Sequence, residues 1–281
     1  MELKNKKEKI IVDFENKLTI LKCPFCSCDL SMNEFSLKCK NNHTFNISKR
    51  GTTILYKTSK LKEDKLYNKG LFLARRQFIN GNFYNDLYTV VGKIIDDNNI
   101  KTVLDMGSGE GTHDIKIIDT LMNKDVQFFG IDLSKDAIDL SNDFIDKKFI
   151  GIVGDLNYLP IKDNTIDLVL NILSPSNEKE IARVLKKDGL IIKVTPKKEY
   201  LSELRCATNM KEYENEEVID KNIHEKYEIV EKKEMINTFN IDAETSHNLV
   251  NMTPLMKNEK AIPYINQITI ALNIYVLRIK R

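Results

Sequence analysis

The sequence predicts an α/β protein with a parallel sheet covered on both faces, preceded by a small β-rich module. Two observations lead to this prediction. From residue 100 onward, short apolar segments that suit strands alternate with segments of helical periodicity. Ahead of them lies a metal-ligand pattern, C-x2-C followed by twelve residues and C-x3-H, formed by Cys23, Cys26, Cys39 and His43. A segment this short cannot bury a core of its own, so a bound metal would have to hold the module together.

Composition narrows the class of protein. The chain of 281 residues is 42% hydrophobic, enough for a packed core, and its net charge of +2 creates no global attraction for nucleic acid. No apolar run approaches the roughly 18 residues of a membrane span, and the charged N-terminus lacks the apolar centre of a signal peptide. Four of the five cysteines lie between Cys23 and Cys39, which is not a disulfide framework. We therefore expect a cytoplasmic protein with no membrane association.

The chain divides into four regions. In order, these are a charged extension (1–18), the β-rich module (19–56), a basic connector with helices (57–99) and the large α/β domain (100–281). We expect the extension to be poorly ordered or to form a single helix. In the first part of the connector, up to Arg76, basic side chains outnumber acidic ones. The basic residues there are Lys57, Lys60, Lys62, Lys65, Lys69, Arg75 and Arg76. They could contact phosphates, but a solvated linker, or a helix that packs against the large domain, also explains them.

Apolar periodicity places the individual elements. In the connector it predicts helices from Gly70 and from Tyr84, separated at Asn80-Gly-Asn82. In the large domain, apolar runs predict strands at 102–105, 126–132, 150–155, 165–173, 190–194 and 268–279. Helices are expected at 112–122, from Lys135 onward, and at 178–187, the last closed by Asp188-Gly189. In the small module, strands are expected at 18–21, 36–39 and 52–56.

The cysteine–histidine pattern predicts a structural zinc site. Two residues between paired thiolates allow a tight turn that places both sulfurs on one ion. Three thiolates and one imidazole complete a tetrahedron and leave no position open for water, so the site would be structural rather than catalytic. Cys28 could compete with Cys26, but C-x2-C closes the turn better than C-x-C or C-x4-C. The alternative is a group of free cysteines beside a chance histidine.

Three alternating glycines lie in Asp105-Met-Gly-Ser-Gly-Glu-Gly111, between the first strand and the next helix. Backbone without Cβ atoms can pass close beneath a ligand at such a point. A dinucleotide-binding loop has the longer spacing G-x-G-x-x-G, and an acidic residue before the loop would repel its pyrophosphate. The same residue suits S-adenosylmethionine, which carries an ammonium group and a sulfonium but no phosphate. We predict that this cofactor is bound by Asp105, Gly107, Gly109, Glu110 and Gly111.

Acidic residues also end the next two strands. Asp132 closes the second strand, where a carboxylate can accept hydrogen bonds from both ribose hydroxyls. Asp155 and Leu156 end the third, where a carboxylate can accept from the adenine amino group. Each has a simpler alternative, Asp132 as a helix N-cap and Asp155 as a turn former. Three acidic residues at three consecutive strand ends favour the cofactor site.

The segment Asn171-Ile-Leu-Ser-Pro-Ser176 follows the fourth strand, where the transferred methyl group should lie. It is only loosely similar to the Asn-Pro-Pro-aromatic motif of amino-group methyltransferases, and a strand terminator explains it as well as a base-contacting loop. The sequence names no general base. Asn171 and Asp155 are candidates by position alone, and Asp155 is the one expected at adenine.

Taken together, the chain resembles the RlmA-type 23S rRNA (guanine-N1)-methyltransferases, which include tylosin-resistance relatives. The resemblance spans most of the chain and rests on the cysteine–histidine pattern, Ala74–Phe78, Leu104–Gly111, Gly130–Lys135, Glu180–Val184, Val194–Pro196 and Asn251–Pro254. It implies a class I, Rossmann-like methyltransferase fold and methylation of N1 of a guanine in a 23S rRNA hairpin. It also implies that the zinc module and connector grip RNA, that Tyr84 and Tyr200 lie beside the cofactor, and that Cys28 is not a ligand. At Lys197-Lys198 the chain departs from the Gly-Pro of the family.

Two other functions fit the same motifs. One is a small-molecule methyltransferase, which would be active without RNA. The other is a non-enzymatic RNA- or antibiotic-binding protein that retains the fold, against which the intact Asp105, glycine loop and Asp132 argue. If the acceptor is N1 of guanine, the base must be unpaired or flipped out, and a general base near N1 would assist. The sequence leaves the oligomeric state open, and a homodimer is one option.

Overall fold

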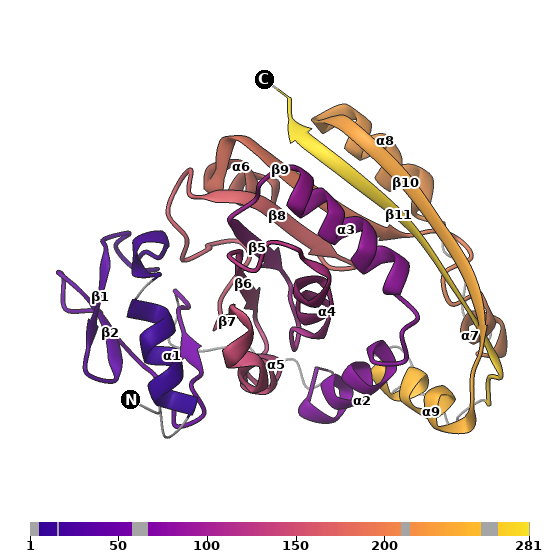
Figure 1. Cartoon of the computed structure of the whole chain (residues 1–281), viewed down its shortest axis with the longest axis horizontal. Coiled ribbons are helices and arrows are strands. Elements are labelled where there is room, and N and C mark those ends of the chain that lie inside the picture. Colours follow the sequence, from indigo (N-terminus) through magenta and orange to yellow (C-terminus); the bar gives the residue numbers. More distant parts are fainter. Residues whose placement is uncertain (1–5, 16, 58–66, 209–213, 254–263, 281) are drawn as a thin grey trace.

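The computed structural model describes residues 6–15, 17–57, 67–208, 214–253 and 264–280. Lys60, Lys62 and Lys65 of the basic connector lie outside these residues. The centre of the molecule is an eight-stranded sheet (Figure 1). Its order is β10 (Tyr227–Asn240), β11 (Gln267–Ile279), β9 (Leu185–Pro196), β8 (Ile166–Ile172), β5 (Thr102–Met106), β6 (Gln127–Asp132), β7 (Phe149–Val153) and β4 (Thr53–Ile54). From β9 to β4 all neighbours are parallel, whereas β11 is antiparallel to both β9 and β10.

The central strands are apolar along their whole length because they are buried on both faces. Neighbouring residues of one strand enter opposite cores and are almost fully buried in them. One core holds Val103, Phe128, Leu168 and Ile192, and the other holds Leu104, Phe129, Val169 and Ile191. The continuous apolar runs in the sequence therefore indicate a parallel sheet covered on both sides, and this prediction is confirmed.

Different elements cover the two faces. The first core is closed by α3 (Asn85–Asp97) and α4 (Thr112–Thr120), and extends to α2 (Lys69–Ile79), α7 (Ser202–Ala207) and α9 (Ala243–Met252). The second is closed by α6 (Glu178–Val184), α8 (Glu216–Lys226) and the N-terminal module. The short α5 (Lys135–Ser141) and the 3-10 helix η2 (Asn142–Lys147) connect β6 to β7. In the part of the chain that the structure describes, no helix is long and apolar enough to cross a membrane.

The N-terminal module lies at one end of the molecule, beside β7, and the long β10–β11 pair lies at the other (Figure 1). The N-terminal module contains α1 (Lys6–Glu15), a 3-10 turn η1 (Leu18–Ile20) and a sheet of β1 (Leu30–Asn33), β2 (Ser36–Cys39) and β3 (Thr44–Asn46). Leu21 and Leu37 are fully buried in the same core as Ile152 of β7. The module is therefore packed onto the large domain rather than tethered beside it.

Four expectations for individual elements need correction. In the segment at 18–21, Leu18–Ile20 form a 3-10 turn and not a strand, and only Leu21 is extended, in a bridge to Ile161. The strand expected at 52–56 belongs to the main sheet, because Thr53 pairs with Ile152. The helix expected at 178–187 ends at Val184, since Leu185 already pairs with Ile166 in the sheet, and Gly189 lies within β9. The strand β10 was not expected, because charged side chains along its exposed edge hide its alternation.

Candidate functional site

A cleft of about 1160 Å³ opens at the carboxyl ends of the parallel strands. Its walls come from the glycine loop after β5, from the ends of β6, β8 and β9, and from α2 and α9. Most residues predicted to bind the cofactor line this cleft, namely Tyr84, Gly107, Gly109, Glu110, Asp132, Asp155, Leu156 and Tyr200. Asp105, which precedes the loop, and Gly111, which ends it, do not line the cleft.

The glycine loop takes a backbone conformation that only glycine adopts easily. Gly107, Gly109 and Gly111 have φ values of 84°, 57° and 81°. A Cβ atom at Gly107 would approach the Cβ of Ser174 to 2.7 Å, whereas a Cβ at Gly109 would meet nothing closer than 3.7 Å. Gly107 is therefore needed for packing against the loop after β8, and Gly109 keeps its face toward the cleft open for a ligand.

Asp132 lies at the tip of β6, next to the glycine loop. Its Oδ2 accepts a hydrogen bond from the amide of Gly109 at 2.9 Å, and its Oδ1 accepts from the amide of Ser134 at 2.8 Å. The N-cap of α5 is Ser134 and not Asp132, so the simpler alternative for Asp132 is wrong. Burial raises the pKa of Asp132, although the two amides oppose this shift. Two amides orient this carboxylate while its remaining lone pairs can still accept hydrogen bonds.

Asp155 follows β7 and forms a turn with its own loop. Its Oδ1 accepts hydrogen bonds from the backbone and side-chain nitrogens of Asn157 at 2.8 and 3.0 Å. The turn-forming role is thus present in the structure. Asp155 and Leu156 also line the cleft together with Leu133. The turn therefore fixes the apolar Leu156 and the carboxylate of Asp155 at the same rim.

Asp105 is buried beneath the glycine loop, at 3% exposure, beside the fully buried Asp114 of α4. Burial raises the pKa of Asp105 to about 7, and burial together with the neighbouring Asp105 raises the pKa of Asp114 well above its ordinary value. The Oδ1 atom of Asp105 and the hydroxyl of Ser108, which lines the cleft, have no hydrogen-bond partner among the described residues. Unpartnered buried polar atoms on this loop fit a polar ligand such as S-adenosylmethionine.

An aromatic cluster forms the floor of the cleft near α3. The hydroxyl groups of Tyr84 and Tyr200 lie 2.8 Å apart, although 116 residues separate them in the sequence. The hydroxyl of Tyr88 lies 2.8 Å from Nδ1 of His113, whose ring also meets Tyr84 edge-on. Burial lowers the pKa of His113 to about 3, so this ring is neutral at physiological pH. No sequence motif marks His113, which is the second residue of the amphipathic helix α4.

The two arginines of α2 have different surroundings. Arg76 donates to Glu110 and Asp143, both at 2.9 Å, and to the carbonyl of Leu140 at 2.9 Å. It therefore joins α2 to the large domain, which supports the alternative of a helix that packs against this domain. Arg75 lines the cleft, packs against the ring of Phe72, and lies beside the open face of Gly109.

The segment after β8 is held by Asn171. Its side-chain nitrogen donates to the carbonyls of Met106 and Pro175, both at 3.0 Å, and to the hydroxyl of Ser174 at 2.6 Å. Its oxygen accepts from the ammonium group of Lys193 at 2.8 Å. Asn171 is therefore fully engaged in shaping this segment, which argues against a direct role as a general base.

Cys23, Cys26, Cys39 and His43 come together in the N-terminal module, and their ligand atoms all lie within 4.8 Å of one another. Nδ1 of His43 lies 3.5 Å from Sγ of Cys23 and 3.4 Å from Sγ of Cys39. The backbone amide of Cys28 lowers the pKa of Cys26 to about 6, whereas burial raises the pKa of Cys23 to about 12. A bound cation would stabilise both thiolates. These four side chains could hold a metal ion, and Cys28 is not among them.

Comparisons with known proteins agree with this geometry. The family model described as a methyltransferase domain matches residues 97–253. YxjB of Bacillus subtilis, whose name assigns it to the 23S rRNA (guanine-N1)-methyltransferases, is 34% identical over 209 residues, or 70% of each chain. The chain belongs to the RlmA-type methyltransferase family. The predicted class I fold, the methyltransferase activity and the dependence on S-adenosylmethionine are thereby confirmed.

Two further matches extend the comparison of this RlmA-type methyltransferase. The 23S rRNA (guanine(748)-N1)-methyltransferase of Streptomyces fradiae is 23% identical over 280 residues, covering 94% of this chain and 98% of that enzyme. A SAM-dependent methyltransferase from Thiobacillus denitrificans, solved with S-adenosyl-L-homocysteine, covers 69% of this chain and 90% of its own, with 14% identity and a TM-score of 0.43.

Proposed function

We propose that this enzyme transfers the methyl group of S-adenosylmethionine to N1 of a guanine in a 23S rRNA hairpin. The extent of the likeness to the Streptomyces fradiae rRNA methyltransferase supports this most directly. The match covers 94% of the chain, so it includes the cysteine–histidine module as well as the cleft. The module shares a buried core with the sheet that carries the cleft. RNA bound to the module would therefore be held in a fixed position relative to the cleft.

In this proposal the cofactor occupies the cleft beside the glycine loop. Asp132 would accept from the ribose hydroxyls, and Asp155 with Leu156 would hold the adenine. Arg75, which lies beside Gly109, would meet the carboxylate of the amino-acid part. Tyr84 and Tyr200 would contact the cofactor at the floor of the cleft. When bound, S-adenosylmethionine supplies an electrophilic methyl group on a sulfonium.

The metal in the N-terminal module would be zinc. Three sulfurs and one imidazole nitrogen form a closed tetrahedral set that leaves no position for a reacting water. The site is also separate from the cleft, since none of the four ligands lines it. We therefore assign the zinc a structural role, which is to hold β1, β2 and β3 in the shape that meets the RNA.

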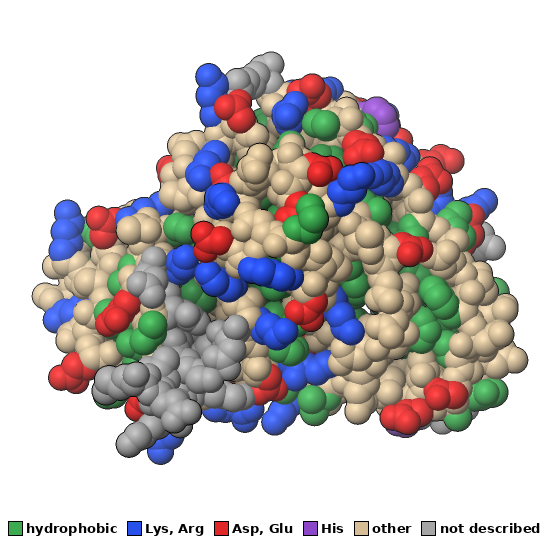
Figure 2. Space-filling view, viewed as in Figure 1, with side chains coloured by type: hydrophobic (Ala, Val, Ile, Leu, Met, Phe, Trp, Pro, Cys, Tyr) green, Lys and Arg blue, Asp and Glu red, His purple; other side chains and the backbone are tan. Residues whose placement is uncertain are grey.

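Several surface features suit an RNA hairpin. On the face seen in Figure 2, lysine and arginine side chains gather across the middle, between the N-terminal module and the β10–β11 pair. Phe25 and Phe35 of the module are 46% and 52% exposed, and Phe25 stacks on the ring of His43. Exposed rings beside basic residues suit the unpaired bases of an RNA loop. The cytoplasmic location and the homodimer remain predictions.

The test is direct transfer to RNA. Purified protein would be incubated with labelled S-adenosylmethionine and 23S rRNA from a strain that lacks this gene, and the product nucleoside would be mapped by mass spectrometry. We expect N1-methylguanine at one position of a hairpin. Methylation of small molecules without any transfer to rRNA would instead favour a small-molecule methyltransferase.

A further inference from the structure

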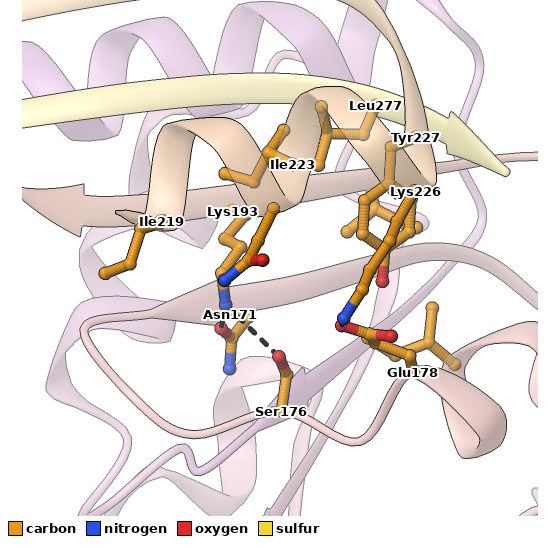
Figure 3. A pocket seen from close by; sticks show the side chains of 12 residues that line it. Asn171, Ser176, Glu178, Lys193, Ile219, Ile223, Lys226, Tyr227 and Leu277 are labelled. Carbon is orange, nitrogen blue, oxygen red and sulfur yellow. Dashed lines mark hydrogen bonds and ion pairs between the residues drawn. The ribbon is translucent and has the colours of Figure 1, made fainter. Parts of the chain in front are cut away.

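Lys193 is a half-buried lysine that follows the buried apolar run Leu190–Ile192 in β9. It lies on β9, where it is the register partner of Asn171 on the parallel strand β8 and of Tyr275 on the antiparallel strand β11. Its Nζ donates to Oδ1 of Asn171 at 2.8 Å and to Oγ of Ser176 at 3.1 Å (Figure 3). It has no carboxylate partner at hydrogen-bond distance in the part of the chain that the structure describes.

Lys193 lies between two cavities. It lines the main cleft together with Ser174, Pro175 and Ser176. It also lines a small pocket of about 170 Å³ beneath α8, where Ile219 and Ile223 cover its aliphatic part (Figure 3). Apolar side chains therefore pack against the aliphatic part of Lys193, while Asn171 and Ser176 hold its nitrogen at the wall of the cleft.

The charged groups around Lys193 are mostly engaged with one another. Glu178 of α6 pairs with Lys226 of α8 at 2.7 Å, and Asp220 of α8 accepts from Tyr275 and Lys232. The remaining titratable group of the small pocket is Tyr227 of β10, whose pKa burial raises to about 12. Burial lowers the pKa of Lys193, and the charge of Glu178 opposes this only in part.

The position of Lys193 agrees with the layout of the cleft. The features that suit the cofactor lie after β5, β6 and β7, at the glycine loop, Asp132 and Asp155. The methyl acceptor must therefore enter over the neighbouring ends of β8 and β9, which carry the segment from Ser174 to Ser176 and Lys193. The side chain of Asn171 is engaged with this segment, whereas Lys193 places a titratable amine beside it at this end of the cleft.

We propose that Lys193, as a neutral amine, is the general base that removes the proton from the acceptor nitrogen. The amine nitrogen has four tetrahedral directions. One carries Cε, and two carry the N–H groups that donate to Asn171 and Ser176. The fourth direction then holds a lone pair that is free to accept a proton. This proposal deepens the function proposed above and rests on it.

In the proposed step, each proton and each electron pair has a defined destination. Lys193 accepts the N1 proton as the N1–H bond breaks and becomes an ammonium. The electron pair of N1 forms the new bond to the methyl carbon, and the electrons of the broken S–C bond remain on sulfur. Lys193 then returns its proton to water before the next turnover. Asn171 and Ser176 act as positioning residues that fix the direction of the lone pair.

The test is the pH dependence of a single turnover on 23S rRNA. Lys193→Met keeps the aliphatic chain and removes the amine. We expect it to slow transfer by about 100- to 10,000-fold at neutral pH, with unchanged affinities for the cofactor and RNA. The wild-type rate should rise with pH and level off above the pKa of Lys193, whereas the variant rate should keep rising. Lys186→Met removes an exposed lysine of the same strand, whose partner is Asp167, and should behave like the wild type.

Chemical rescue separates a base from a structural lysine. Propylamine should accelerate Lys193→Ala in proportion to its unprotonated form, because the added amine replaces the missing base. Two outcomes would overturn the role of Lys193 while leaving the proposed function intact, provided that the wild type transfers methyl groups to rRNA. One is a pH profile of Lys193→Met that equals that of the wild type. The other is a slow Lys193→Ala that propylamine does not rescue. Absence of any transfer to rRNA by the wild type would overturn the proposed function itself.

Discussion

The carboxylate of Asp132 accepts a hydrogen bond from the backbone amide of Gly109 at 2.9 Å, and so ties the end of β6 to the loop that follows β5. The loop and the acidic strand end are 23 residues apart, yet they form one unit. A substitution at Asp132 therefore affects both the proposed ribose contact and the shape of the loop.

We predict that Asp132→Ala weakens the affinity for S-adenosylmethionine by roughly 10- to 100-fold. The reason is the loss of hydrogen bonds to a charged acceptor, each of which contributes about 1.5–3 kcal/mol. Isothermal titration calorimetry would measure the affinity. Asp119→Ala is the matched control, because Asp119 is half-exposed and pairs only with the surface residue Lys147. Equal affinities for the two variants would refute the role of Asp132.

We predict that substitution of Arg76 lowers the free energy of unfolding, whereas substitution of its neighbour Arg75 lowers the affinity for the cofactor. Arg76→Met leaves the carboxylate of Glu110 buried at 2% exposure without its charged partner, so we expect the free energy of unfolding to fall by about 3–5 kcal/mol. Arg75→Met should leave that free energy nearly unchanged and weaken cofactor binding instead. Urea denaturation and calorimetry on both variants distinguish the two roles. Similar unfolding midpoints for the two variants would contradict this assignment.

Local patterns explain why much of the fold and site could be predicted. Each central strand is buried on both faces, so its apolar run is continuous and visible in the sequence, as in Phe149–Val153. The glycine loop and the four metal ligands depend on short spacings, and the acidic strand ends follow directly from the strand positions. Such features need no knowledge of distant contacts.

The features that escaped prediction depend on contacts between distant segments. Thr53 joins the main sheet only because Ile152 of β7 offers an open edge. The burial of Asp105 beside Asp114 could not be predicted, because α4 brings Asp114 to it beneath the loop. Lys193 was expected only as part of a strand, because its partners Asn171 and Ser176 come from a distant segment and become visible only in the fold.

The buried acids beneath the loop predict how stability depends on pH. The pKa of Asp105 is about 7 in the folded protein and near its ordinary value of 3.8 when unfolded. Between these values the folded protein binds the extra proton, so the free energy of unfolding falls as pH rises, and this contribution is lost above about pH 7. For one group the slope is at most about 1.4 kcal/mol per pH unit.

Urea denaturation without ligand, between pH 5 and pH 8, would measure this slope in the wild type and in Asp105→Asn. The amide of the variant does not titrate, so we expect a shallower decline over this range. Asp114, whose pKa is also raised, should account for the part that remains. An identical decline in both proteins would show that Asp105 is ionised in the folded state.

The cysteine–histidine module predicts a sharp contrast between two cysteines. Cys39 is 4% exposed and belongs to the ligand cluster, whereas Cys28 lies outside it, and its sulfur donates to the carbonyl of Cys26 and accepts from Asn41. Elemental analysis should find one zinc per chain in the wild type and in Cys28→Ser, and none in Cys39→Ser. Because β2 shares a core with the sheet, loss of the metal should also lower the melting temperature of the whole protein by roughly 5–10 °C. Full zinc content in Cys39→Ser would exclude this residue as a ligand, and loss of zinc from Cys28→Ser would show that the turn uses the other sulfur.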